Sequence, residues 1–125
     1  MKQQRFSISK RLKSFKYAFN GLRILIKEEH NARIHLFATV CVIIAGLFFN
    51  ISMNEWIGVI FSIGLVFSLE IINSSIENIA DFISPEKHEM IKKIKDLSAS
   101  GVLISAITAL IIGLIIFIPK ILKLC

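Results

Sequence analysis

Residues 97–118, which read LSASGVLISAITALIIGLIIFI, decide the fold because they contain no charged side chain. A helix needs about 20 predominantly apolar residues to cross the hydrocarbon core of a bilayer, and this run meets that length by itself. Two further apolar runs, LFATVCVIIAGLFF at 36–49 and WIGVIFSIGLVFSL at 56–69, reach it only by extending into polar flanks. We therefore predict transmembrane helices over residues 32–52, 55–82 and 90–119.

The composition excludes the common soluble classes. The chain has 125 residues, of which 54% are hydrophobic and 19% are charged. A soluble domain of this size must cover a relatively large surface with polar side chains, and disordered chains are poor in apolar residues. Its two cysteines, Cys41 and Cys125, are too far apart in sequence to indicate a disulfide framework or a metal knuckle. We expect a single-domain, all-α integral membrane protein over residues 1–125.

The segment 8–28 is predicted to form an amphipathic helix ahead of the first span. Its apolar residues recur at spacings of three and four, and its basic residues mostly occupy the other side. Such a helix is suited to lie in the anionic interface of a membrane. The net charge of +6 does not indicate nucleic-acid binding, because no motif for it accompanies the basic residues. The apolar set is Leu12, Phe15, Phe19, Leu22 and Ile26, and the basic set is Lys10, Arg11, Lys13 and Lys16.

The distribution of basic residues predicts the orientation. Of the 15 Lys and Arg residues, Lys120 and Lys123 follow the last span, and the turn 50–55 has none. All the others, among them Lys2 and Arg5, precede the first span or lie in the loop 82–95. Because Lys and Arg are enriched in cytoplasmic loops, we expect the N-terminus and the loop 82–95 to be cytoplasmic.

The second span carries an acidic stripe, which we define as Glu70, Asn73, Glu77 and Asp81. Their spacing of three and four residues places them on one face of a helix. An acidic side chain at membrane depth costs about 2.5–3.5 kcal/mol, so several on one face must meet protein, water or a cation. Three structural alternatives remain open: Glu70 pairs with Lys95, Asn73 and its serine neighbours pack helices together, or Glu77 and Asp81 lie among the headgroups.

Further polar pairs, Glu28-Glu29 and Lys95-Asp96, are expected at the same membrane level as the end of the acidic stripe. Carboxylates from two helices suit Mg²⁺, which keeps water and substrate phosphates in its shell, and nearby cations suit a triphosphate. Glu70 lies one to two turns deeper, where a lipid hydroxyl could reach it. The pattern therefore predicts phosphoryl transfer to a membrane alcohol, without a P-loop or a soluble-kinase motif.

The run Glu70-x-x-Asn73-x-x-x-Glu77, with Asp81, His88-Glu89 and Lys95-Asp96 after it, resembles the prokaryotic diacylglycerol kinase family. The resemblance extends from about residue 10 to residue 119. It implies a small three-span lipid kinase in the bacterial cytoplasmic (inner) membrane, with ATP as co-substrate and Mg²⁺ as cofactor. It also implies a homotrimer whose active sites form between subunits.

The resemblance implies a role for each matching residue. Glu70 is expected to be the general base or the residue that orients the hydroxyl, with Asn73 beside it. Glu29 and Glu77 are expected to bind Mg²⁺. Lysine stands at position 10, where the relatives usually have arginine, so that Arg11 is an alternative to Lys10. The expected nucleotide contacts are Lys10, Tyr17, Glu86, His88, Lys95 and Asp96, with Asp81 nearby.

The family has an undecaprenol branch and a diacylglycerol branch. Residues 67–70, 111–119 and 31–35 resemble the undecaprenol branch, and His35 replaces a glutamate of the diacylglycerol branch. We therefore expect transfer of the γ-phosphate of ATP to undecaprenol, giving undecaprenyl phosphate. The alternative within the family is a diacylglycerol kinase that makes phosphatidic acid. Outside it, a small proton- or cation-coupled transporter would also use an intramembrane glutamate, and a non-catalytic membrane subunit is the third possibility.

Overall fold

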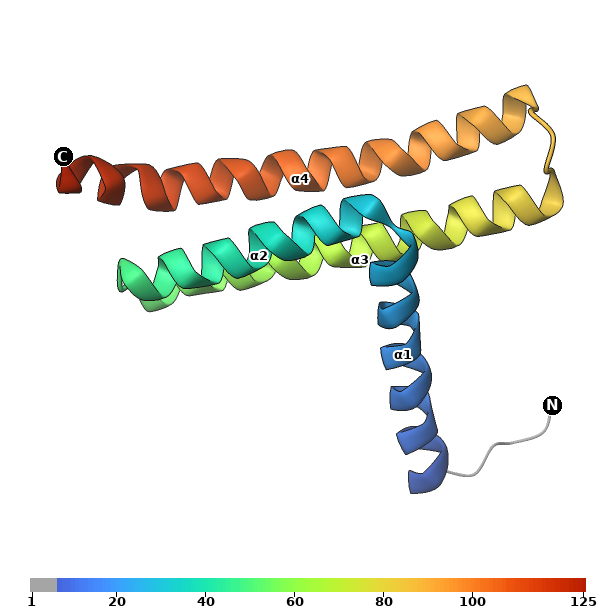
Figure 1. The fold of residues 1–125 in the computed structure, drawn as a ribbon, viewed down its shortest axis with the longest axis horizontal. Helices are drawn as coiled ribbons and strands as arrows, with labels where there is room; N and C mark the ends of the chain where they lie inside the picture. Colours follow the sequence, from blue (N-terminus) through green and yellow to red (C-terminus); the bar gives the residue numbers. More distant parts are fainter. Residues whose placement is uncertain (1–6) are drawn as a thin grey trace.

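The computed structural model describes residues 7–125, and this part of the chain forms four helices and no strand (Figure 1). The helices are α1 (Ile8–Glu28), α2 (His30–Phe48), α3 (Met53–Ile83) and α4 (Glu89–Leu124). Helices α2, α3 and α4 are each long and apolar enough to cross a membrane, which confirms the predicted all-α fold with three spans. Two residues counted in the charge asymmetry, Lys2 and Arg5, lie outside the described residues.

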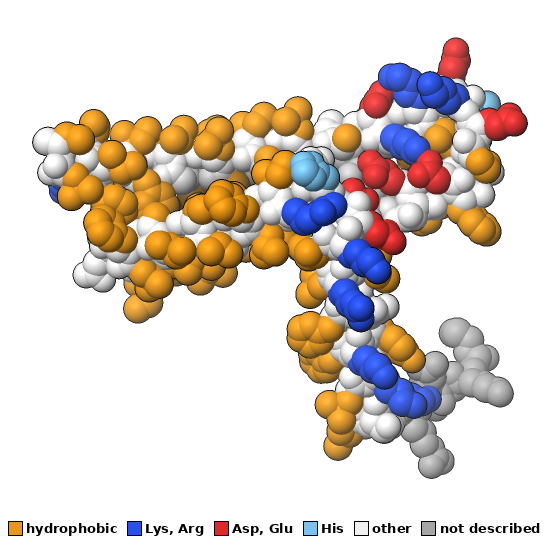
Figure 2. Space-filling model, viewed as in Figure 1, with side chains coloured by type: hydrophobic (Ala, Val, Ile, Leu, Met, Phe, Trp, Pro, Cys, Tyr) orange, Lys and Arg blue, Asp and Glu red, His pale blue; other side chains and the backbone are white. Residues whose placement is uncertain are grey.

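Helix α3 packs against both α2 and α4, whereas α1 runs away from them across their common direction (Figure 1). At about 1.5 Å per residue, the 31 residues of α3 and the 36 residues of α4 extend about 46 and 54 Å. Both exceed the hydrocarbon core, which is about 30 Å thick. The α3–α4 hairpin therefore reaches past the α1–α2 corner, and charged side chains gather there and along α1 (Figure 2).

Most large apolar side chains of the spans point outward, as expected for a surface covered by lipid rather than water. Phe37 on α2 is 73% exposed and Phe61 on α3 is 68% exposed. The apolar face of α1 is exposed too, with Phe15 and Phe19 among its members. The direction of α1 across the spans and its apolar face suit a helix that lies in the plane of the membrane.

Helix α2 ends at Phe48, earlier than the expected residue 52, because the chain turns at Asn50. Asn50 has φ of 50°, a left-handed conformation that asparagine tolerates better than most residues. The backbone N–H of Ile51 donates to Gly46 O at 3.2 Å, which closes the turn. Gly46 leaves room for Trp56, since a Cβ there would lie 2.6 Å from the Cη2 atom of the indole.

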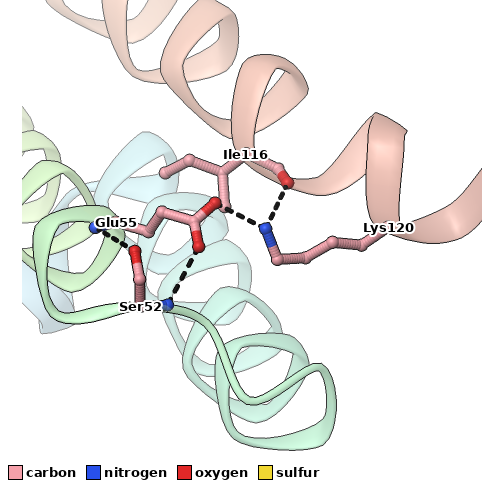
Figure 3. Close-up of polar contacts among 4 residues, drawn as sticks. All are labelled: Ser52, Glu55, Ile116 and Lys120. Atoms are coloured by element: carbon pink, nitrogen blue, oxygen red, sulfur yellow. Dashed lines mark hydrogen bonds and ion pairs between the residues drawn. The ribbon is translucent and has the colours of Figure 1, made fainter.

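A polar clamp joins the start of α3 to the end of α4 (Figure 3). Ser52 caps α3: its Oγ accepts from the backbone N–H of Glu55 at 3.2 Å, and its own N–H donates to Glu55 Oε1 at 2.9 Å. Lys120 Nζ donates to Glu55 Oε2 and, at 3.2 Å, to the carbonyl of Ile116. Lys120, which follows the predicted last span, therefore also joins α4 to α3 through its ion pair with Glu55.

Candidate active site

The acidic stripe begins deep in the bundle and ends in the open. Glu70 is 1% exposed, Asn73 is 9% exposed and Glu77 is half-buried, whereas Asp81 is exposed. Ser74, next to Asn73 on α3, is also buried. This gradient follows from helix geometry, since α2 covers α3 only as far as the α1–α2 corner and leaves the later turns uncovered.

The α1–α2 corner brings Glu29 to this face of α3. Glu29 has extended backbone angles, φ −103° and ψ 113°, and thus separates the two helices. Leu25 and Ala32, on either side of the corner, are 3% and 0% exposed and anchor it. The side chain of Ser74 donates to Glu29 Oε1 at 3.1 Å. We define the Glu70 cluster as Glu29, His35, Glu70, Asn73 and Ser74.

His35 of α2 is the nearest ionisable partner of Glu70. Its Nε2 atom lies 3.1 Å from Glu70 Oε1. The contact is close but not aligned as a hydrogen bond, so among residues 7–125 neither Glu70 Oε1 nor Asn73 Oδ1, both buried, has an aligned donor. Buried acceptors of this kind are rare in native proteins and call for an explanation. The alternative that Glu70 pairs with Lys95 is wrong, because Lys95 instead binds Asp81.

A second set of predicted residues surrounds a cleft of about 580 Å³ where α3 turns into α4, which we call the hairpin cleft. Lys95 Nζ donates to Asp81 across it, and Lys92 Nζ lies 2.8 Å from Asp96 Oδ2. His88 caps α4 through Nδ1, which accepts from the N–H of Met90 at 3.1 Å. The predicted residues that line the cleft are Asp81, Glu86, His88, Lys95 and Asp96.

Lys10 and Tyr17 are not brought to either set. Both lie exposed on α1, and Tyr17 is 69% exposed. The first turns of α1 are the part of this helix that is farthest from α3 and α4 (Figure 1). A single chain therefore assembles the Glu70 cluster and the hairpin cleft. It leaves Lys10 and Tyr17 exposed, away from both.

The carboxylates fit a divalent cation that arrives with its own ligands. Within residues 7–125, no group of three or more His, Cys, Asp or Glu side chains could hold a metal ion alone. Ser74 holds Glu29 at the acidic stripe, and Glu77 lies on the same face of α3 about one turn beyond Asn73. Mg²⁺ is commonly held by one or two carboxylates together with substrate phosphates, so the two fit this ion as part of a nucleotide complex.

His35 and Ser74 lie in the Glu70 cluster but are not among the site residues predicted above. An ionisable residue at the start of a span is itself a signal of function, and His35 directly precedes the run 36–49. The sequence favours a packing role for Ser74, although this residue neighbours the acidic stripe. Its contact with Glu29 joins residues 45 positions apart, which local spacing does not reveal.

Comparison with known proteins identifies the family. The family model described as prokaryotic diacylglycerol kinase matches residues 16–117. The undecaprenol kinase of Bacillus subtilis strain 168 is 36% identical, over 95% of this chain and 97% of that protein. The diacylglycerol kinases of Haemophilus influenzae and Escherichia coli K12 are 33% and 31% identical, over 85% and 80% of this chain and 91% and 82% of those proteins. These matches confirm the resemblance indicated by the acidic stripe, and the chain belongs to the prokaryotic diacylglycerol kinase family.

Proposed function

We propose that this protein transfers the γ-phosphate of ATP to the hydroxyl group of undecaprenol. The observation that carries the proposal is the buried carboxylate of Glu70 beside the amide of Asn73, whose buried Oδ1 has no aligned donor among residues 7–125. An alcohol is the donor that such a site suits. The charged hairpin cleft lies further along α3, where the chain turns into α4 and a soluble nucleotide can approach. Membership of a kinase family favours this activity over a transporter or a non-catalytic subunit.

The proposed orientation places the N-terminus and the hairpin cleft in the cytoplasm of a bacterium, on the inner membrane. The support is the charge asymmetry together with α1, whose basic residues and exposed apolar face suit the cytoplasmic interface. In this orientation, Glu70 lies just below the membrane surface and the hairpin cleft lies above it. A lipid alcohol and a nucleotide then reach the acidic stripe from opposite sides.

In the proposed reaction, the alcohol oxygen forms a bond to the γ-phosphorus while the bond to the β–γ bridging oxygen breaks and ADP leaves. Glu70 orients the hydroxyl and accepts its proton late, since a loose transition state needs little deprotonation before attack. Asn73, one turn away, adds a polar contact to the hydroxyl. Burial of Glu70 keeps competing water away from the reacting oxygen.

The nucleotide is proposed to lie in the hairpin cleft against Lys95, with Glu86, His88 and Asp96 around it. Asp81 holds Lys95 in place. Glu29 and Glu77 would hold Mg²⁺, which would neutralise charge on the phosphate oxygens. Since Lys10, with Arg11 as its alternative, and Tyr17 lie away from the cleft of their own chain, we propose that a neighbouring subunit of a homotrimer supplies them.

The similarity to the undecaprenol kinase of Bacillus subtilis favours undecaprenol as the substrate. The similarity to diacylglycerol kinases makes diacylglycerol the second candidate. The test gives the purified protein γ-labelled ATP and equal amounts of the two lipids in the same micelles. We expect label in undecaprenyl phosphate at the higher kcat/KM. Label chiefly in phosphatidic acid would assign the second candidate, and label in neither lipid would contradict the kinase proposal.

A further inference from the structure

His35 contacts the buried Glu70 and is itself partly exposed, and the proposed mechanism gives this histidine no role. Its side chain is 25% exposed, whereas that of Glu70, 3.1 Å from Nε2, is 2% exposed. Because His35 comes from α2 and Glu70 from α3, the contact also joins two helices. The histidine is therefore the more accessible member of the pair and the one that can face an incoming ligand.

A buried carboxylate needs a donor to hold it in one orientation, because an unpaired charge in an apolar region is costly. The imidazole tautomer that carries its hydrogen on Nε2 can supply that donor with a small change in angle. One oxygen of Glu70 is then directed to His35. The other is left for the acceptor hydroxyl, so the position of His35 decides where the carboxylate meets its substrate.

His35 also lines a cavity of about 100 Å³ between α2, α3 and α4, which we call the three-helix groove. The rest of its lining is mostly small or apolar and includes Ala38, Val66 and Gly113. The groove extends from His35 toward the Met53 end of α3, which is deeper in the membrane in the proposed orientation. The hydrocarbon chain of an alcohol bound at Glu70 must run in that same direction.

We propose that His35 is a positioning residue for the lipid acceptor: its Nε2–H donates to Glu70 Oε1 and fixes the carboxylate at the His35 end of the three-helix groove, where the lipid hydroxyl arrives. The inference rests on the proposed function. It assigns His35 to the lipid side of the reaction, since the hairpin cleft that would take the nucleotide is lined by other residues. Changes at His35 should therefore affect the kinetics of the lipid and leave those of ATP unchanged.

The experiment compares three proteins with the wild type in the labelled-ATP assay, with lipid and ATP varied separately. His35→Leu keeps the size of the side chain and removes the donor, whereas His35→Gln keeps a donor at a reach similar to Nε2. Cys41→Ala is the matched control on α2, because Cys41 is exposed and does not line the groove. A melting curve of each protein in detergent checks that it is folded.

We expect His35→Leu to lower kcat/KM for the lipid by about 10- to 100-fold, the range that a misplaced reacting group costs, with KM for ATP within about twofold of wild type. His35→Gln should recover most of the loss. Wild-type kinetics in His35→Leu would overturn the inference, as would an equal loss in both variants accompanied by a raised KM for ATP.

If His35→Leu does not fold, His35→Asn replaces it, because its amide is one methylene shorter and does not reach Oε1. Equal activity of His35→Asn and His35→Gln would then overturn the inference. An inactive wild type would contradict the proposed function itself, whereas an active wild type with unchanged His35 variants would contradict this inference alone.

Discussion

Gly46→Ala tests the packing of α2 on α3, which holds the Glu70 cluster together. The new Cβ would lie 2.6 and 2.9 Å from two carbons of the Trp56 ring and 3.2 Å from Ile51 Cδ1. Contacts under 3.0 Å force a shift, and the rigid indole has few ways to move. Overpacking of this kind costs about 1–3 kcal/mol, while replacing a helical glycine by alanine returns up to about 1 kcal/mol.

The net destabilisation expected for Gly46→Ala is about 0–2 kcal/mol, a factor of up to about 30 in the unfolding equilibrium. The assay is unfolding by SDS in mixed micelles, followed by tryptophan fluorescence, since Trp56 is the single tryptophan and lies at the altered contact. Gly64→Ala on α3 is the matched control, because a Cβ there meets nothing within 4 Å. A Gly46→Ala midpoint at or above that of Gly64→Ala would refute the packing argument.

Three further changes test other parts of the structure. Lys95→Gln should raise KM for ATP by about tenfold through loss of a charged donor and leave KM for the lipid unchanged, and an unchanged ATP titration would contradict the placement of the nucleotide. Glu77→Ala should raise the Mg²⁺ concentration needed for half-maximal activity, and an identical metal titration would remove Glu77 from the metal site. Lys120→Met should lower the SDS midpoint, and adding Glu55→Gln to it should cost little more, since the clamp is already broken; additive losses would show that the two side chains act independently.

The helices could be predicted from the sequence because their causes are local. The uncharged run 97–118 specifies a membrane-spanning segment by length and hydropathy, whatever it packs against. The spacing of Phe15, Phe19 and Leu22 likewise specifies an amphipathic helix before any contact forms. The acidic stripe was predictable for the same reason, since residues three and four apart share a helix face.

The partners of the site residues could not be predicted, because they depend on which helices meet. Sequence spacing does not distinguish Lys95 from other basic residues as the partner of Glu70. The packing of α2 on α3 makes His35 that partner. The bond from Ser74 to Glu29 exists only because the chain turns at Glu29. Lys120 and Glu55 are 65 residues apart, and they meet because α3 and α4 are antiparallel.

Lys10 and Tyr17 show a different limit. Their assignment came from family resemblance, and in the single chain both are exposed on α1, away from the hairpin cleft. One chain specifies the fold, whereas the site that we propose needs two. Lys95→Gln and Tyr17→Ala should each raise KM for ATP, and mixing the two proteins should restore sites with the wild-type KM if subunits share the site. The absence of such sites from mixed trimers would contradict the sharing.

Label transfer from ATP to lipid by Glu70→Gln tests most directly whether Glu70 receives a lipid hydroxyl beside a bound nucleotide. The matched control is Glu28→Gln, which makes the same change at an exposed carboxylate near the α1–α2 corner. We expect Glu70→Gln to lose about 10²- to 10⁴-fold in kcat while it still binds ATP, and we expect Glu28→Gln to keep wild-type activity. Equal label incorporation by Glu70→Gln and the wild type would contradict this role of Glu70.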